Sequence, residues 1–156
     1  MYLRKFTHLL FIALLAFPLI GQAQNAKGTQ NQLNTTRWYP FRVDEKGLTA
    51  QVNVADSKIA QYYTPVFKKY GYMGTALTWD SMIAELISAN DVDFMVNNDL
   101  DLTASGNTFT IGASSKEELE NALKIIQPTF AVISKLDAFV KSVDPTHIKD
   151  GHPEIQ

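Results

Sequence analysis

Residues 100–119, LDLTASGNTFTIGASSKEEL, decide the fold class of this chain. Apolar and polar side chains alternate on both sides of Ser105-Gly106-Asn107, a sequence typical of a tight β-hairpin turn. The following segment, Ser115 to Glu118, has the pattern of a helix-capping box. A hairpin that leads directly into a helix favours an α+β fold with an antiparallel sheet over alternating parallel β-α units.

Two upstream segments show the same alternation. Residues 39–43 and 48–54 alternate around a polar turn and predict a second hairpin. Pro40 cannot donate a ladder hydrogen bond, so the first strand should be an edge strand or begin after it. Residues 92–96 also alternate and predict a further strand. A sheet of alternating strands has one covered face and one face in water.

The first helical segment follows the N-terminal hairpin. Asp56 or Ser57 is the expected N-cap, and Gly71 is the expected residue just after the C-terminus. Pro65 interrupts the apolar spacing, so a kink or a restart is expected there.

Three more helices are expected. One should open with Thr78 as N-cap, carry the strongest amphipathic pattern in the chain, and end near Asn90. Another should start at Ser115, and Pro128 should break it and begin the last helix. The expected order is β-β-α-α-β-β-β-α-α, with the helices packed on one face of the sheet.

The N-terminus has the pattern of a cleavable signal peptide. Arg4 and Lys5 precede an apolar run over residues 9–20, and small residues precede an expected cleavage after Ala23. A membrane anchor is the alternative, but 12 apolar residues fall short of the roughly 20 that a spanning helix needs. Residues 1–23 are therefore interpreted as a signal peptide, and the mature protein as periplasmic or secreted.

The mature chain divides by composition. Residues 24–36, rich in Asn, Gln and Thr, predict a flexible leader. Residues 37–144 predict a single α+β domain, and residues 145–156 predict a polar tail. The mature protein should have no membrane association, and its oligomeric state is left open.

Composition excludes several classes of function. Hydrophobic residues make up 46% and charged residues 19%, as in ordinary globular proteins. The net charge of −2 becomes −4 when Arg4 and Lys5 leave with the signal peptide. An acidic chain argues against nucleic-acid binding. The absence of cysteine excludes disulfides, thiolate zinc sites and thiol nucleophiles.

Candidate catalytic and metal-binding residues are few. After signal cleavage the only histidines are His147 and His152, both in the predicted tail, so neither a catalytic triad nor a histidine zinc site is expected. A calcium loop of the EF-hand type starting at Asn97 would need Gly and Glu where Leu102 and Thr108 stand. We therefore expect no catalytic residues, no metal and no cofactor.

Carboxylates leave one enzymatic alternative, an envelope hydrolase with two acidic residues. The candidates are Asp80, Glu85, Asp91, Asp93, Asp99 and Asp101. Asp93, Asp99 and Asp101 alternate with apolar residues, which favours an exposed sheet face over a catalytic pair. On that face they could remain solvated or meet a basic partner.

The most distinctive stretch is residues 70–81, YGYMGTALTWDS. Its aromatic residues and Met73 suggest a surface that grips a partner, because Tyr and Trp dominate interface hot spots. The alternative is structural: Trp79 is in phase with Met82 and Ile83 and is therefore expected in the core.

This stretch resembles the immunity protein 51 family of bacterial polymorphic toxin systems. The matching residues are Gly71, Tyr72, Gly74, Trp79, Asp80 and Ser81. The similarity in order of hairpins and helices extends roughly from Phe41 to Val143. The resemblance implies a protein without enzymatic activity that binds and neutralises a cognate toxin. With the signal peptide, that toxin would act in the periplasm.

The partner-binding residues expected on these grounds are Tyr72, Met73, Trp79, Asp93, Asp99 and Asp101. The alternative function is a periplasmic small-ligand-binding or stress-response domain, which would need a concave apolar pocket.

Overall fold

The computed structural model describes residues 37–150. The predicted signal peptide and leader, residues 1–36, lie outside the described residues, as do residues 151–156 of the predicted tail. Within residues 37–150, no helix is long and apolar enough to cross a membrane.

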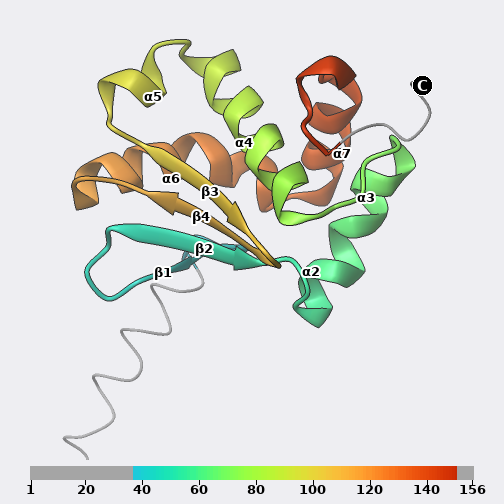
Figure 1. The fold of residues 1–156 in the computed structure, drawn as a ribbon, viewed down its shortest axis with the longest axis horizontal. Coiled ribbons are helices and arrows are strands. Elements are labelled where there is room, and N and C mark those ends of the chain that lie inside the picture. Colours follow the sequence, from blue (N-terminus) through green and yellow to red (C-terminus); the bar gives the residue numbers. More distant parts are fainter. Residues whose placement is uncertain (1–36, 151–156) are drawn as a thin grey trace, which may run out of the picture.

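The described chain is an α+β fold, as predicted. Four antiparallel strands, β1 (Arg42–Val43), β2 (Thr49–Asn53), β3 (Asp101–Ser105) and β4 (Thr108–Gly112), form one sheet in the order β1-β2-β4-β3. Figure 1 shows the two hairpins side by side, with α6 passing behind β3 and β4. The expectation for Pro40 is confirmed, because β1 begins after it and lies at the sheet edge.

The sheet has one covered and one open face. Ala50, Val52, Phe109 and Ile111 point inward and are fully buried. The alternate positions, such as Gln51 and Thr103, are polar and exposed. The expected packing of helices on one face is therefore confirmed, since strand alternation assigns the buried set to a single side.

The first helical segment is split as Pro65 predicts. Asp56 caps α2 (Ser57–Tyr62), its side chain accepting a hydrogen bond from the Lys58 backbone. Helix α3 (Thr64–Lys69) restarts with Pro65 in its first turn, where the missing N–H of proline costs nothing. Gly71 follows with a φ of 86°, the left-handed conformation expected just past a helix end.

Helix α4 (Ala76–Asn90) begins earlier than predicted. The N-cap is Thr75, and the expected N-cap Thr78 is the third helical residue. The two threonines form a reciprocal capping box: Thr75 Oγ1 accepts from the Thr78 N–H, and Thr78 Oγ1 accepts from the Thr75 N–H. The apolar spacing predicted this helix and its end at Asn90 correctly. It took Thr78, the second residue of the capping box, for the N-cap.

The predicted strand at residues 92–96 is wrong. This segment forms the short helix α5 (Phe94–Asn97). Asp91 starts the turn by accepting a hydrogen bond from the Asp93 N–H, and the Asn98 side chain closes it by donating to the Phe94 carbonyl. Three alternating apolar residues are too few to distinguish the period of a strand from that of a helix. The local side-chain hydrogen bonds favour the helix here.

The C-terminal helices are α6 (Lys116–Phe130) and α7 (Ile133–Ser142). Ser115 caps α6 by accepting from the Glu118 N–H, as predicted. The predicted break at Pro128 is wrong: α6 continues to Phe130 and the chain restarts at Ile133. Proline removes one helical hydrogen bond, but complete burial of Phe130 in the core holds the last turn in place.

Candidate functional site

Trp79 lies at the centre of the core. It is 1% exposed, and four aromatic rings surround it at centroid distances of 5.0 to 6.2 Å: Phe41, Tyr63, Phe67 and Phe130. The core interpretation of Trp79 is therefore confirmed. As a partner-binding residue it is misplaced, since its ring does not reach the surface.

The loop before Trp79 is also largely structural. Tyr72 is 2% exposed, and burial raises its pKa above the ordinary value. Gly74 has a φ of 77°, and a Cβ there would lie 3.3 Å from the Thr64 methyl group. Of the predicted binding residues in this loop, Met73 alone is accessible, at 55%. Three of the residues that carry the family resemblance, Gly71, Tyr72 and Gly74, thus shape the α3–α4 connection in this chain.

The predicted polar tail is wrong for residues 145–150, because they pack on α4. A 3-10 turn, η1 (Pro145–His147), leads to Ile148, which is buried. The Lys149 ammonium lies 3.1 Å from the buried Asp80 carboxylate, and the Lys149 N–H donates to Ser81 Oγ at 3.1 Å. The domain therefore extends at least to residue 150. We call residues 147–150 the C-terminal strap.

Both ends of the C-terminal strap add polar contacts. The hydroxyls of Thr75 and Thr78 donate to the Asp150 carboxylate at the start of α4, where a negative charge is favoured by the helix dipole. His147 Nδ1 lies 3.1 Å from the Glu85 carboxylate, and this hydrogen bond raises the pKa of His147. His147 is therefore not simply solvated, as its tail position suggested.

The predicted row of carboxylates on the exposed sheet face is wrong in part. Asp101 begins β3 and is exposed, as expected. Asp93 precedes α5, and Asp99 lies in the turn after it with a φ of 46°; both are exposed but neither is in a strand. Because α5 replaces the predicted strand, the open face carries hydroxyl and amide groups and a single one of these carboxylates.

The same segment nevertheless concentrates charge and apolar surface. Val92 is 77% exposed and Val96 is 85% exposed, the highest values among the large exposed hydrophobic residues described. Four aspartates flank them: Asp91, Asp93, Asp99 and Asp101. We call these six residues, on α5 and its two flanks, the acidic corner. In Figure 1, α5 lies beyond the upper end of α4 and leads into β3.

No positive charge balances the acidic corner from its own part of the sequence. Residues 70–115 contain no Lys or Arg. The ion pairs of the described chain join Arg42 to Asp56, Lys69 to Asp137, His147 to Glu85 and Lys149 to Asp80. Within residues 37–150, the four aspartates of the acidic corner therefore have no ion-pair partner. Sequence reasoning named three of these residues as partner-binding, Asp93, Asp99 and Asp101. It missed Val92 and Val96 because it placed residues 92–96 in a strand.

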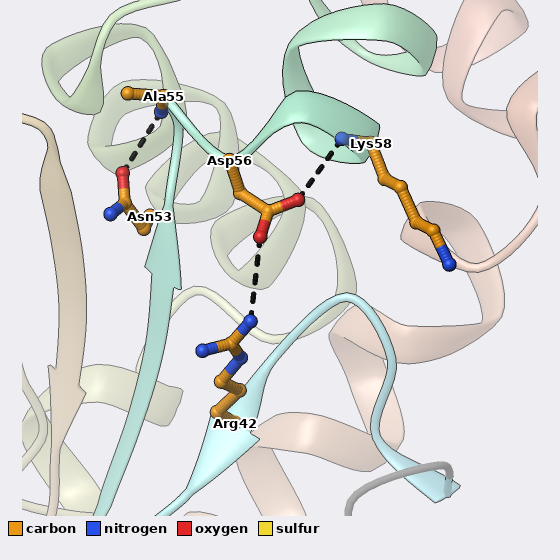
Figure 2. A network of polar contacts seen from close by, with 5 residues as sticks. All are labelled: Arg42, Asn53, Ala55, Asp56 and Lys58. Atoms are coloured by element: carbon orange, nitrogen blue, oxygen red, sulfur yellow. Dashed lines mark hydrogen bonds and ion pairs between the residues drawn. The ribbon is translucent and has the colours of Figure 1, made fainter.

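A pocket of about 680 Å³ lies between β1, β2 and the start of α2. Apolar side chains including Tyr39 and Ile59 line part of it. Its rim is charged: Arg42 Nη2 lies 3.4 Å from Asp56 Oδ2, and Asp56 Oδ1 accepts from the Lys58 N–H at 3.0 Å, as Figure 2 shows. The volume suits a small ligand, but the lining is not the dominantly apolar wall typical of such sites.

Clusters of metal-binding side chains and buried carboxylates are the features by which a metal site or a hydrolase would be recognised in the described part of the chain. Within residues 37–150, no three His, Asp or Glu side chains are placed to hold a metal ion. Asp80 is the one buried carboxylate of this range, and Lys149 pairs with it. The buried carboxylate pair that the hydrolase alternative requires is thus not formed by these residues.

Comparisons with protein-family models, with curated proteins and with solved structures give no significant match. The resemblance of residues 71–81 to the immunity protein 51 family stays a prediction.

Proposed function

We propose that this protein is an exported immunity protein that binds a basic toxin acting in the periplasm and blocks it without catalysis. The observation that carries the proposal is the acidic corner: four aspartates without an ion-pair partner in the described chain flank two exposed valines in the sequence. Apolar contacts at the centre of an interface supply affinity, and complementary charge around them speeds association.

The position of the acidic corner suits docking. Phe94 and Met95 of α5 pack against the core, and the Leu100 N–H donates to the Met95 carbonyl. The corner is therefore anchored from beneath while Val92 and Val96 face solvent. A surface held in this way loses little conformational entropy when a partner binds.

The proposal is tested first by affinity capture with the mature protein, followed by co-expression of the captured protein with and without it. The captured protein should be toxic when directed to the periplasm, and co-expression should restore growth. N-terminal sequencing of the exported protein should begin at Gln24 or within a few residues of it. Retention of residues 1–20 in the membrane fraction would contradict export, and a harmless captured protein would contradict the immunity role.

The surface is tested by the double variant Asp93→Lys with Asp101→Lys. Asp91 and Asp99 are left intact, since Asp91 accepts the Asp93 N–H and Asp99 has a positive φ that a lysine would adopt with strain. The double variant should keep the wild-type melting temperature and associate several-fold more slowly at low salt. The difference should fade at high ionic strength, because salt screens exposed charges.

A charge-matched control is Glu117→Lys with Glu120→Lys on α6, which changes the net charge equally. It should associate with the toxin nearly as fast as the wild-type protein. Equal rates for both double variants at low salt would remove the acidic corner from the interface.

A small-ligand-binding role is the second candidate, supported by the pocket beside α2. It predicts that a library of charged small metabolites raises the melting temperature through this pocket, and that Arg42→Ala abolishes the increase. Arg42→Ala should leave toxin binding unchanged if the first proposal is correct.

A further inference from the structure

The two edges of the sheet are built differently. Edge strand β1 has two residues, follows a proline and carries Arg42. Edge strand β3 has five residues, with no proline and no lysine. Short strands, proline and charged side chains, above all lysine, are the usual means by which proteins prevent a further strand from pairing with an edge. Edge strand β1 combines all three, whereas the one charged side chain of β3 is that of Asp101 at its first residue.

The register shows which backbone groups of β3 point outward. The Val54 N–H donates to the Asn107 carbonyl, and the Ala113 N–H donates to the Leu48 carbonyl. These bonds show that the odd-numbered residues of β4 form their backbone hydrogen bonds with β2. The even-numbered residues of β4 therefore bond to β3, because the direction of the backbone hydrogen bonds alternates along an antiparallel strand.

The even residues of β4 are paired with Asp101, Thr103 and Ser105. The N–H and C=O groups of Leu102 and Ala104 therefore point away from the sheet. No strand lies beyond β3 among residues 37–150. Outside the ladder itself, the backbone bonds of the described chain include none to Leu102 or Ala104. Two donors and two acceptors are thus directed outward along this edge.

The surroundings of this edge define the chemistry of a strand that would pair with it. Asp101 is its first residue and Asp99 lies just before it, and Asp91 and Asp93 precede the adjoining helix α5. Residues 70–115 offer no Lys or Arg, so a second copy of this chain meeting the edge through the same segment would bring only further negative charge. A basic, extended segment is complementary to it.

We propose that the outer edge of β3 accepts an extended basic segment of a partner protein as an added strand. This inference rests on the proposed toxin-binding function and names the backbone groups that would receive the toxin. The N–H and C=O groups of Leu102 and Ala104 bind the backbone of the segment, and Asp99 and Asp101 meet its lysine or arginine side chains. Backbone pairing supplies the affinity of such strand addition, and side-chain charge selects the partner.

The probe is a blocked, fluorescent peptide of alternating lysine and valine, seven residues long, and a peptide of alternating glutamate and valine is its charge control. The basic peptide should bind the wild-type protein, more weakly as salt rises, and the acidic peptide should not bind. On binding, the backbone amides of Leu102 and Ala104 should become protected from hydrogen exchange, while those of Thr103 and Ser105 should already be protected in the free protein.

Ala104→Pro is the decisive variant. It removes an outward N–H, a position where an edge strand tolerates proline, and leaves the bonds of Thr103 and Ser105 to β4 in place. It should weaken peptide binding by about tenfold or more, since it deletes one hydrogen bond and blocks the approach of a strand. Ala104→Ser keeps the N–H at the same site and should bind within about twofold of the wild-type protein.

The inference would be overturned by no binding of the basic peptide, by no protection of Leu102 and Ala104, or by equal binding of Ala104→Pro and the wild-type protein. A wild-type dimer that Ala104→Pro converts to a monomer would assign the edge to a second copy and would also overturn it. Toxin binding that is unaffected by Ala104→Pro would exclude this edge but leave the immunity role standing. Wild-type peptide binding does not depend on whether Ala104→Pro folds.

Discussion

Replacing Trp79 with alanine tests the packing on which the whole domain depends. Its ring is 1% exposed and contacts the rings of Phe41, Tyr63, Phe67 and Phe130. These residues come from four separate segments: the approach to β1, the α2–α3 junction, α3 and the end of α6. Removing the indole therefore removes contacts to all four of these segments at once.

The expected loss of stability follows from the burial of the Trp79 side chain. A buried tryptophan hides about 200 Å² or more of surface, and at about 25 cal/mol per Å² this corresponds to about 5 kcal/mol. Alanine keeps a small part of that area, and partial collapse around the cavity recovers some of the rest. We expect the free energy of unfolding to fall by about 3–5 kcal/mol, within the range measured for buried aromatic truncations.

Urea denaturation followed by far-UV circular dichroism measures this loss. Met73→Ala is the control, because Met73 lies in the loop before α4 and is exposed; it should change the free energy of unfolding by less than about 0.5 kcal/mol. If Trp79→Ala does not fold, Trp79→Phe should fold with an intermediate loss. A loss below about 1 kcal/mol for Trp79→Ala, with an unchanged denaturant slope, would refute the central position of this ring.

Two further predictions concern the strap and the α3–α4 loop. The hydrogen bond to Glu85 raises the pKa of His147 above its ordinary value of 6.5. The pair therefore contributes its full stabilisation of the folded state below pH 6.5, and this contribution is lost as pH rises through the folded-state pKa. The difference in melting temperature between the wild-type protein and His147→Gln should accordingly be largest near pH 5.5 and shrink toward pH 8, and a constant difference would contradict the pairing. Gly74→Ala should lower the free energy of unfolding by about 1–2 kcal/mol because φ is positive there. Gly112→Ala is the control and should change it little, because Gly112 has no positive φ and a Cβ there would meet its nearest neighbour at an ordinary 3.6 Å. Equal losses in the two variants, measured by urea denaturation, would contradict this explanation.

Much of the fold could be predicted because its signals are local and mutually consistent. The turn at residues 105–107, the cap at Asp56, the restart at Pro65 and the left-handed Gly71 each follow from one residue's geometry. The alternation around the 105–107 turn also fixed which strand residues face the core. These features do not depend on which distant segment packs against them.

The errors arise where few residues carry the signal or where a distant segment decides. Three alternating residues at 92–96 could not outweigh the side-chain hydrogen bonds of Asp91 and Asn98. Pro128 is overridden by the burial of Phe130. A lone Ile148 among polar residues gives no periodic pattern, so its burial could not be foreseen.

The candidate site, too, could be predicted in part. Asp93, Asp99 and Asp101 were recognised as exposed carboxylates, and their exposure is observed. Their arrangement was not predictable, because it depends on α5. The exposure of Val92 and Val96 was missed for the same reason, although the absence of Lys and Arg from residues 70–115 is visible in the sequence alone.

The C-terminal strap also sets an order for folding during synthesis. Its hydrogen bonds to α4 join residues 68 to 75 positions apart, so Asp80 and Ser81 cannot find these partners until residue 149 has left the ribosome. Such distant contacts form late, because a long segment of chain must first be brought together. Until that point the Asp80 carboxylate, which is buried in the folded domain, also lacks the Lys149 ammonium that neutralises it.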